Sequence, residues 1–171
     1  MIETLHETRW LKLQRDGRWD FVRRPDSDHA VGILAITPQD EVVLVEQLRI
    51  PVQKRTIELP AGIVGDEPEH RGEPLAETAR RELLEETGYR AGKIEELVVS
   101  PTSAGMTAEI THLFLARELE KAGDGGGVGH EEIEIHHVPL AEIRSWIAAR
   151  QAGGTLVDFK IQAALWAAGF S

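Results

Sequence analysis

Residues 79–89 read ARRELLEETGY, and three of their glutamates, Glu82, Glu85 and Glu86, decide how the chain is interpreted. Side chains three and four positions apart lie on the same face of a helix, so these carboxylates would be neighbours. Neighbouring like charges repel each other, which leaves two explanations. Either the helix carries a solvated acidic surface, or bound cations hold the carboxylates together.

A helix over these residues is supported by the residues at both of its ends. Pro74 suits the first turn of a helix, where a missing N–H costs nothing. Gly88 suits the position just after the last turn. An apolar stripe on the neighbouring face is expected to pack against the core; it consists of Ala76, Ala79, Leu83 and Leu84.

The sequence around the helix follows a longer pattern. Glu73 is followed by seven residues and then by Arg-Glu-Leu-Leu-Glu-Glu-Thr-Gly at 81–88. This order is similar to the Nudix box: a glycine, five residues, a glutamate, seven residues, Arg-Glu, an aliphatic residue, any residue, Glu-Glu, any residue, a glycine and an aliphatic residue. Tyr89 takes the last, usually aliphatic, place. On this pattern the chain resembles the Nudix hydrolases.

The loop before the helix departs from the family's spacing. ELPAG at 58–62 is the usual lead-in, yet ten residues rather than five separate Gly62 from Glu73. We favour a five-residue insertion, because Gly62 lies within that lead-in. The alternative is that Glu67, at the regular glycine position, replaces the glycine. The departure bears on the role of Glu73 more than on the glutamates of the helix.

The resemblance implies a site for divalent cations, Mg²⁺ or alternatively Mn²⁺. Mg²⁺ prefers oxygen ligands and often bridges carboxylates to substrate phosphates, so it would also offset the repulsion among the glutamates. The expected metal ligands are Glu82, Glu86 and the carbonyl of Ala61. Glu85 is expected to be a further ligand or a catalytic group behind the ligands. Arg81 is expected to act in catalysis by orienting the glutamates through charge-assisted hydrogen bonds.

Segments on both sides of the box resemble ADP-ribose pyrophosphatases and related nucleotide-sugar hydrolases. They are VEQLRIPVQKRTIELPAG at 45–62, SPTSAGMTAEITHLFLA at 100–116 and GHEEIEIHHVPLAEI at 129–143. The resemblance implies that Arg49 contacts a substrate phosphate, with a surface arginine at a strand end as the alternative. Glu58 is expected to bind substrate as well.

Two features bear on which substrate is bound. Many ADP-ribose hydrolases carry Ser-Pro-Gly soon after the box, whereas here Thr102-Ser103-Ala104 stands between Ser100-Pro101 and Gly105. That loop borders the sugar end of the substrate in those enzymes, so GDP-mannose or another nucleotide sugar stays open beside ADP-ribose. Trp19 is expected to stack on the nucleobase across a dimer interface, with simple packing in that interface as the alternative.

Five glycines between residues 123 and 129 predict a mobile loop. By the resemblance, Glu131 just after these glycines supplies a catalytic carboxylate or a metal ligand, and the adjacent Glu132 is the alternative for that role. A mobile loop would bring in such a base when substrate is bound. The ordinary alternative is a solvated pair of loop glutamates.

The pattern of strands and helices indicates the fold class. β-Branched apolar runs separated by turn residues predict strands, and two amphipathic stretches near the C-terminus predict helices. The expected fold is α/β (α+β), a Nudix-type α/β/α sandwich with a mixed central sheet and about three helices. Residues 1–28 are expected to form an N-terminal β-hairpin extension for dimerisation and the substrate pocket, and residues 29–171 the hydrolase domain. Trp146 and Trp166 are expected in the core.

Composition limits the classes of function. The 171 residues carry a net charge of −10 and include no cysteine, which excludes disulfides and thiolate catalysis. A strongly acidic chain disfavours a nucleic-acid partner. No apolar run approaches the roughly 20 residues needed to cross a membrane, and the first residues lack a signal pattern, so we expect no membrane partner and a cytoplasmic location.

The expected function is metal-dependent hydrolysis of the diphosphate linkage of an ADP-ribose-like nucleoside diphosphate sugar by a homodimer. The products would be a nucleoside monophosphate and a sugar phosphate. The alternatives are a hydrolase for GDP-mannose or another nucleotide sugar, and a non-catalytic nucleotide-sugar sensor. A hydrolase of mutagenic nucleotides or capped RNA is disfavoured by the net charge and the N-terminal extension.

Overall fold

The structure is a computed structural model that describes residues 1–65, 68–127 and 132–170. Its described strands form a three-stranded and an eight-stranded sheet. The strands are β1 Glu3–Glu7, β2 Lys12–Asp16, β3 Trp19–Arg23, β4 His29–Ile36, β5 Glu41–Arg49, β6 Lys54–Glu58, β7 Ala61–Ile63, β8 Tyr89–Pro101, β9 Ile110–Lys121, β10 Glu134–Pro139 and β11 Leu156–Val157. The α-helices are α1 Leu75–Thr87, α2 Ile143–Ala152 and α3 Phe159–Ala167, and single 3-10 turns cover Ile50–Val52, Pro68–His70 and Leu140–Glu142.

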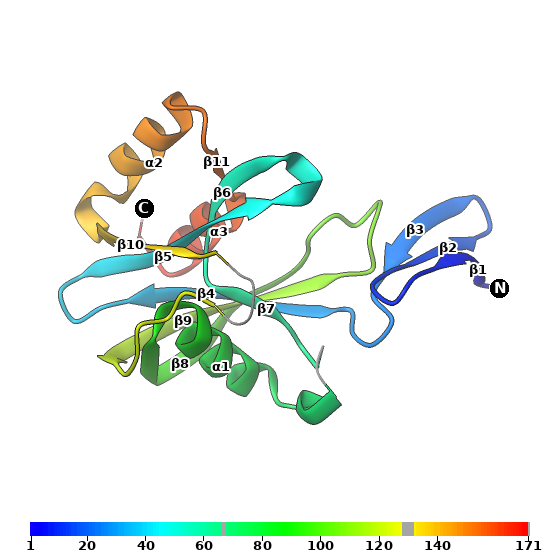
Figure 1. Ribbon diagram of the computed structural model, residues 1–171, viewed down its shortest axis with the longest axis horizontal. Coiled ribbons are helices and arrows are strands. Elements are labelled where there is room, and N and C mark those ends of the chain that lie inside the picture. The colour runs from blue at the N-terminus through cyan, green and yellow to red at the C-terminus, as the bar shows by residue number, and fades with distance from the viewer. Residues whose placement is uncertain (66–67, 128–131, 171) are drawn as a thin grey trace.

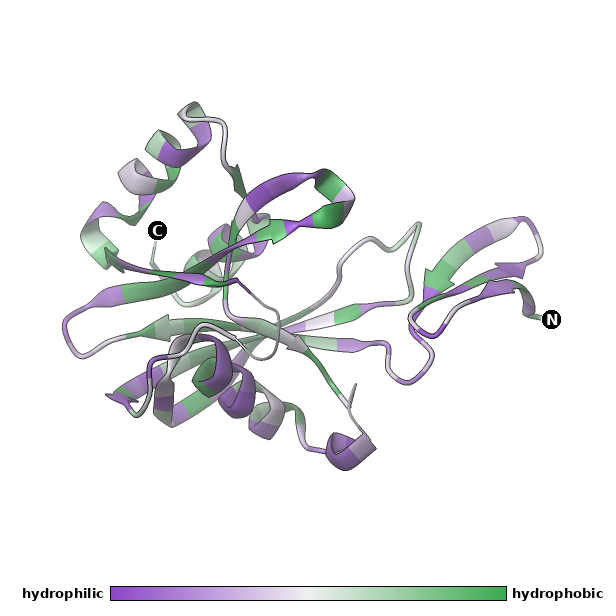
Figure 2. Ribbon diagram, viewed as in Figure 1, coloured by the Kyte–Doolittle hydropathy of each residue, from purple (hydrophilic) through white to green (hydrophobic). Residues whose placement is uncertain are grey.

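The large sheet lies between α1 on one face and α2 with α3 on the other (Figure 1). Ala79 and Leu83 of α1 pack with Val31, Ile33 and other residues of one sheet face. Residues of α2 and α3 pack on the opposite face in a second apolar cluster. Apolar residues concentrate in the central strands, whereas much of α1 is polar (Figure 2). The predicted sandwich with a mixed sheet is confirmed, since β4–β9 and β6–β11 pair in parallel and the other pairs are antiparallel.

A divergence of β4 from β5 creates the space for a site. The two strands pair only at Ala35–Val43 and Ile36–Val42, next to their connecting turn. Beyond that point the segment 54–63 fills the gap, with β6 pairing with β5 and β7 pairing with β4. The sequence analysis named neither β7 nor β11, because strands of two or three residues carry too little periodicity to be recognised.

The N-terminal sheet projects from one end of the molecule (Figure 1). The predicted hairpin is present as β2 and β3, but a third strand, β1, pairs with β2. β1 was missed because ETLHE has no clear apolar alternation, and all five residues are exposed. The sheet joins the body where the Val22 N–H donates to Met106 O and the Ala108 N–H donates to Val22 O.

The predicted core tryptophans have different environments. Trp146 is partly buried against the second apolar cluster and packs beside the His136 ring. The prediction for Trp166 is wrong, because its side chain is 76% exposed on α3. That helix is only nine residues long and buries Ile161, Ala164 and Leu165, so its outward side is left to Trp166.

None of the helices in the described parts of the chain combines the length and the apolar character needed to cross a membrane.

Candidate active site

A cavity of about 270 Å³ opens where β4 and β5 diverge. Residues from five strands, two helices and two loop positions line it, and its walls are rich in charged groups. They are Arg24, Ala30, Val31, Gln47, Arg49, Glu58, Ala61, Gly62, Ile63, Glu82, Glu86, Glu109, Thr111 and Lys160. The cavity therefore gathers residues that lie as much as 136 positions apart in the chain, from Arg24 to Lys160.

Helix α1 holds two of the predicted metal ligands against β7. The Ala61 N–H donates to Glu86 Oε2 at 3.0 Å, and Glu86 is only 5% exposed. A Cβ atom at Gly62 would lie 2.0 Å from the carboxyl carbon of Glu82, so only glycine leaves room for this carboxylate. Glu82 and Glu86 are one helical turn apart and both line the cavity.

Arg81 lies among three carboxylates. Its Nη1 is 2.8 Å from Glu82 and 3.3 Å from Glu85, and its Nε is 3.4 Å from Glu73. Burial alone would lower the pKa of Arg81, but Glu82, Glu85 and Glu73 more than compensate and raise it. The guanidinium therefore stays charged and pairs with all three of these glutamates.

Glu73 has a defined place in spite of the longer loop before α1. Its carboxylate also accepts a hydrogen bond from Thr78 Oγ1 at 2.9 Å, and its partner Arg81 is 17% exposed. Glu73 thus braces the arginine from the N-terminal end of the helix. Glu67, the alternative occupant of the glycine position, lies outside the described residues.

The ligand atoms that Glu82, Glu86 and Ala61 can offer fit a hard divalent cation. Glu82 and Glu86 offer only oxygen atoms, and the backbone of Ala61 lies beside them, hydrogen-bonded to Glu86 through its N–H. Mg²⁺ and Mn²⁺ favour carboxylate, carbonyl and water oxygens. Neither histidine nor cysteine is among the described residues that line the cavity, so ions that prefer nitrogen or sulfur are a poorer match.

Two arginines also line the cavity, each held by a glutamate. Arg49 donates to both oxygens of Glu58 at 2.6 Å in a bidentate pair, and Glu58 is 6% exposed. Arg24 donates to Glu109 Oε2 at 3.3–3.4 Å. Thr102 donates to the other oxygen of Glu109 at 2.9 Å. Fixed guanidinium groups of this kind match the geometry of phosphate oxygens.

The predicted mobile loop is in part bound to the end of α1. The N–H groups of Ala122 and Gly123 donate to Gly88 O, and those of Gly126 and Gly127 donate to Glu86 O and Glu85 O. A Cβ atom at Gly125 would come within 2.4 Å of the Thr87 backbone, so the glycines serve this close approach. The described part of the segment is therefore a cap on α1 and not a free loop.

None of the remaining predicted residues that the structure describes lines the cavity. Glu131 lies outside the described residues, and Glu132 is exposed. Glu85 is held by Arg81 but does not line the cavity. Trp19 is 57% exposed on β3 in the projecting sheet, and it is not among the described residues that line the cavity.

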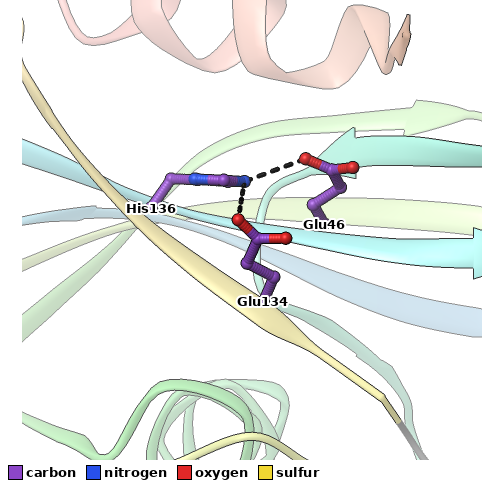
Figure 3. Close-up of side chains that lie close together, drawn as sticks. All are labelled: Glu46, Glu134 and His136. Carbon is purple, nitrogen blue, oxygen red and sulfur yellow. Dashed lines mark hydrogen bonds and ion pairs between the residues drawn. The ribbon is translucent and has the colours of Figure 1, made fainter.

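A second carboxylate cluster lies on the opposite side of β5 (Figure 3). His136 Nε2 is 3.0 Å from Glu46 and 3.8 Å from Glu134, and these three could also offer ligand atoms to a metal ion. Arg55 already pairs with Glu46 at 2.7 Å and with Glu134 at 3.5 Å. Burial would raise the pKa of Glu46, but hydrogen bonds from Arg55 and His136 more than compensate and lower it. This cluster is a network of ion pairs and hydrogen bonds that ties β10 to β5 and β6.

Sequence reasoning missed Arg24, Glu109 and Lys160 as cavity residues. Arg24 and Lys160 stand in no motif, and Glu109 belongs to a segment that was interpreted only through its serine and proline. The order of strands in the sheet brings them to the cavity, and no local pattern reports that order.

Comparisons with known proteins agree with this geometry. The NUDIX domain family matches residues 26–157. An ADP-ribose pyrophosphatase of Bacillus subtilis (strain 168) is 35% identical over 146 residues, covering 84% of this chain and 74% of that protein. A methanol dehydrogenase activator of Bacillus methanolicus is 34% identical over 159 residues, covering 87% and 82%. A GDP-mannose pyrophosphatase of Escherichia coli (strain K12) is 31% identical over 151 residues, covering 81% and 75%. The crystal structure of an ADP compounds hydrolase has the same fold, with a TM-score of 0.76 at 19% identity over 98% of this chain and 89% of that one.

Proposed function

Because this chain belongs to the Nudix family, we propose that it is a pyrophosphohydrolase that cleaves the diphosphate linkage of a nucleoside diphosphate sugar. The observation that carries the proposal is one cavity lined both by the α1 carboxylates Glu82 and Glu86 and by two arginines that glutamates hold in place. An anionic diphosphate needs both: cations to neutralise it and hydrogen-bond donors to hold it.

The carboxylates of α1 that line the cavity are proposed to hold Mg²⁺, with Mn²⁺ as an alternative. Glu82, Glu86 and the carbonyl of Ala61 would bind the ions, and Glu85 would stand behind them. Bound ions would neutralise phosphate charge and polarise the phosphorus that is attacked. Arg81 keeps Glu82 and Glu85 in place, since its Nη1 lies within 3.3 Å of both carboxylates.

The arginines that line the cavity are proposed to bind the phosphates. Arg49 would donate a hydrogen bond to a phosphate oxygen. Glu58 would then act in substrate binding through Arg49, because its two 2.6 Å hydrogen bonds hold the guanidinium at the cavity wall. Water would attack one phosphorus and release a nucleoside monophosphate and a sugar phosphate.

Glu131 or Glu132 is proposed to supply the base that activates this water. Support comes from the glycine segment before them, which is anchored to the carbonyls of Glu85 and Glu86 on α1. The chain therefore passes the C-terminal end of α1, the helix that carries Glu82 and Glu86, shortly before it reaches these two residues. Replacing both with glutamine should lower kcat strongly; an unchanged kcat would remove them from the mechanism.

The N-terminal sheet is proposed to form a homodimer interface and to complete the substrate pocket. It exposes a set of large apolar side chains, which a single copy leaves uncovered: Ile2, Leu5, Trp10, Leu11, Leu13 and Trp19. In such a dimer Trp19 would stack on the nucleobase bound by the partner. Sedimentation of the protein and of Trp19→Ala, together with KM for the substrate, would test both parts.

ADP-ribose is the substrate favoured by the similarity to an ADP-ribose pyrophosphatase, and GDP-mannose is the alternative favoured by the similarity to a GDP-mannose pyrophosphatase. The experiment is turnover on a panel of ADP-ribose, GDP-mannose, other nucleotide sugars, dinucleotide polyphosphates and nucleoside triphosphates, with Mg²⁺ and with EDTA. We expect one nucleotide sugar to dominate and EDTA to abolish its turnover. Binding of a nucleotide sugar without turnover would instead indicate a sensor.

A further inference from the structure

Lys160 enters the cavity from the side of the sheet opposite to α1. Its helix, α3, belongs to the apolar cluster that packs on that other face. The start of α3 is fixed to β6, because the Asp158 N–H donates to Ile57 O at 2.9 Å and Val157 pairs with Ile57. This attachment places Lys160 at the cavity wall near Glu58, the residue that follows Ile57.

The charges along the wall distinguish Lys160 from the two arginines. The described residues that line the cavity include three cations, Arg24, Arg49 and Lys160, and the carboxylates Glu58, Glu82, Glu86 and Glu109. The two arginines are each paired with a carboxylate that itself lines the cavity. Lys160 is paired with Asp158, which does not line it. Of these three cations, Lys160 is therefore the one whose carboxylate partner lies outside the cavity wall, so it adds positive charge to that wall.

Asp158 has a second task that does not depend on the lysine side chain. Its Oδ1 accepts the Lys160 backbone N–H at 2.8 Å and so caps the N-terminus of α3. Its other oxygen holds the Lys160 ammonium group. Removing the lysine side chain should therefore leave the helix cap intact, which separates a role in binding from a role in folding.

We propose that Lys160 is a substrate-binding residue that donates to a phosphate oxygen of the nucleotide sugar from the α3 side of the cavity. A lysine ammonium is a compact charge on a flexible stem, so it can shift from Asp158 to a phosphate without moving the helix. The inference rests on the proposed function, because it assigns a further contact for the same diphosphate substrate.

The test compares Lys160→Met and Lys160→Arg with Lys93→Met as the matched control. Lys93 lies on β8, its side chain is 61% exposed, and it does not line the cavity. We expect Lys160→Met to raise KM for ADP-ribose or GDP-mannose by about tenfold or more, as for the loss of one charge-assisted hydrogen bond, with a smaller change in kcat. Lys160→Arg should recover part of the loss, and the melting temperatures should stay close to that of the wild type.

Binding is measured separately, by calorimetric titration of ADP-ribose and GDP-mannose in EDTA. Weaker binding by Lys160→Met, but not by Lys93→Met, would support the proposal even if the wild type turned over neither compound. That second result would count against the proposed hydrolysis alone. If KM and the dissociation constant of Lys160→Met stayed within twofold of the wild type, the assignment would be wrong. A lowered melting temperature with unchanged KM would show that Lys160 acts only in the structure.

Discussion

Two clusters of glutamates lie on opposite sides of the large sheet, and they differ in how their charge is balanced. On the α1 side, Arg81 is shared among Glu73, Glu82 and Glu85, while Glu86 borders the same cavity. On the α2 side, the carboxylates of Glu46 and Glu134 both pair with the Arg55 guanidinium. The His136 imidazole also lies close to both of them (Figure 3).

This difference separates a site from a structural network. Carboxylates that are compensated by fixed partners stabilise the fold and have little reason to bind an ion. A cluster of carboxylates that is open to a cavity gains free energy when a divalent cation binds. Buried glutamates alone therefore do not identify a metal site; the local balance of charge and access to a cavity do.

The most direct test of the difference between the two clusters is to remove one buried carboxylate from each. Glu86 and Glu46 are matched for this purpose, being 5% and 6% exposed. Glu86→Gln should lower kcat by about 100-fold or more, because it removes a proposed metal ligand. Glu46→Gln should leave kcat within about twofold. Steady-state turnover on the substrate found in the panel measures both, and equal losses would undo the distinction.

A smaller loss should follow from displacing Glu82 without changing its charge. Gly62→Ala would place a Cβ atom 2.0 Å from the Glu82 carboxyl carbon, so the carboxylate has to move away from β7. We expect turnover to fall by roughly 10- to 100-fold, since misplaced catalytic groups are costly. Gly153→Ala, just after α2, is the control, because Gly153 does not line the cavity and its Cβ would meet nothing closer than 3.3 Å. Added Mg²⁺ or Mn²⁺ should restore part of the activity.

Stability should show the opposite order from activity. Glu46→Gln breaks hydrogen bonds to Arg55 and His136 on the α2 side, and we expect it to lower the free energy of unfolding by about 2 kcal/mol. Without metal, Glu86→Gln removes negative charge from a crowded cluster and should cost less. Urea denaturation in EDTA compares the two variants. A larger loss for Glu86→Gln would mean that its carboxylate is mainly structural.

The smallest expected effect is the pH dependence of the free energy of unfolding that Glu46→Gln loses. The pKa of Glu46 in the folded protein lies below its ordinary value of 4.5, so the ionised carboxylate stabilises the fold. That contribution is complete well above pH 4.5 and is lost as the pH falls through the lowered pKa. The gap in unfolding free energy between wild type and Glu46→Gln should therefore shrink between pH 6 and the acid limit of folding. A gap that is constant over this range would contradict the assignment.

Much of the α1 cluster could be predicted from the sequence. The spacing of Glu82, Glu85 and Glu86, with Pro74 and Gly88 at the ends, is a local signal, and the helix occupies the expected residues. The pairing of Arg81 with the glutamates also follows from neighbours on one helix. Local periodicity was enough to predict these neighbours, because residues one helical turn apart are in contact regardless of how the rest of the chain folds.

The N-terminal extension and the glycine-rich segment were predicted less well. A third strand and the cap on α1 both depend on backbone hydrogen bonds, which leave little trace in side-chain patterns. Trp166 shows the same limit for burial, since an apolar residue in an amphipathic stretch can still face outward.

The sequence by itself determined the family and the helix with its glutamates. Only the tertiary structure decided what shares a cavity with them. Arg24, Glu109 and Lys160 reach it because β4 and β5 diverge, β9 lies beside β4 and α3 is fixed to β6. The network of Glu46, His136 and Arg55 likewise depends on β10 and β6 both pairing with β5. Such contacts join residues far apart in the chain, and strand order, which no short stretch encodes, brings them together.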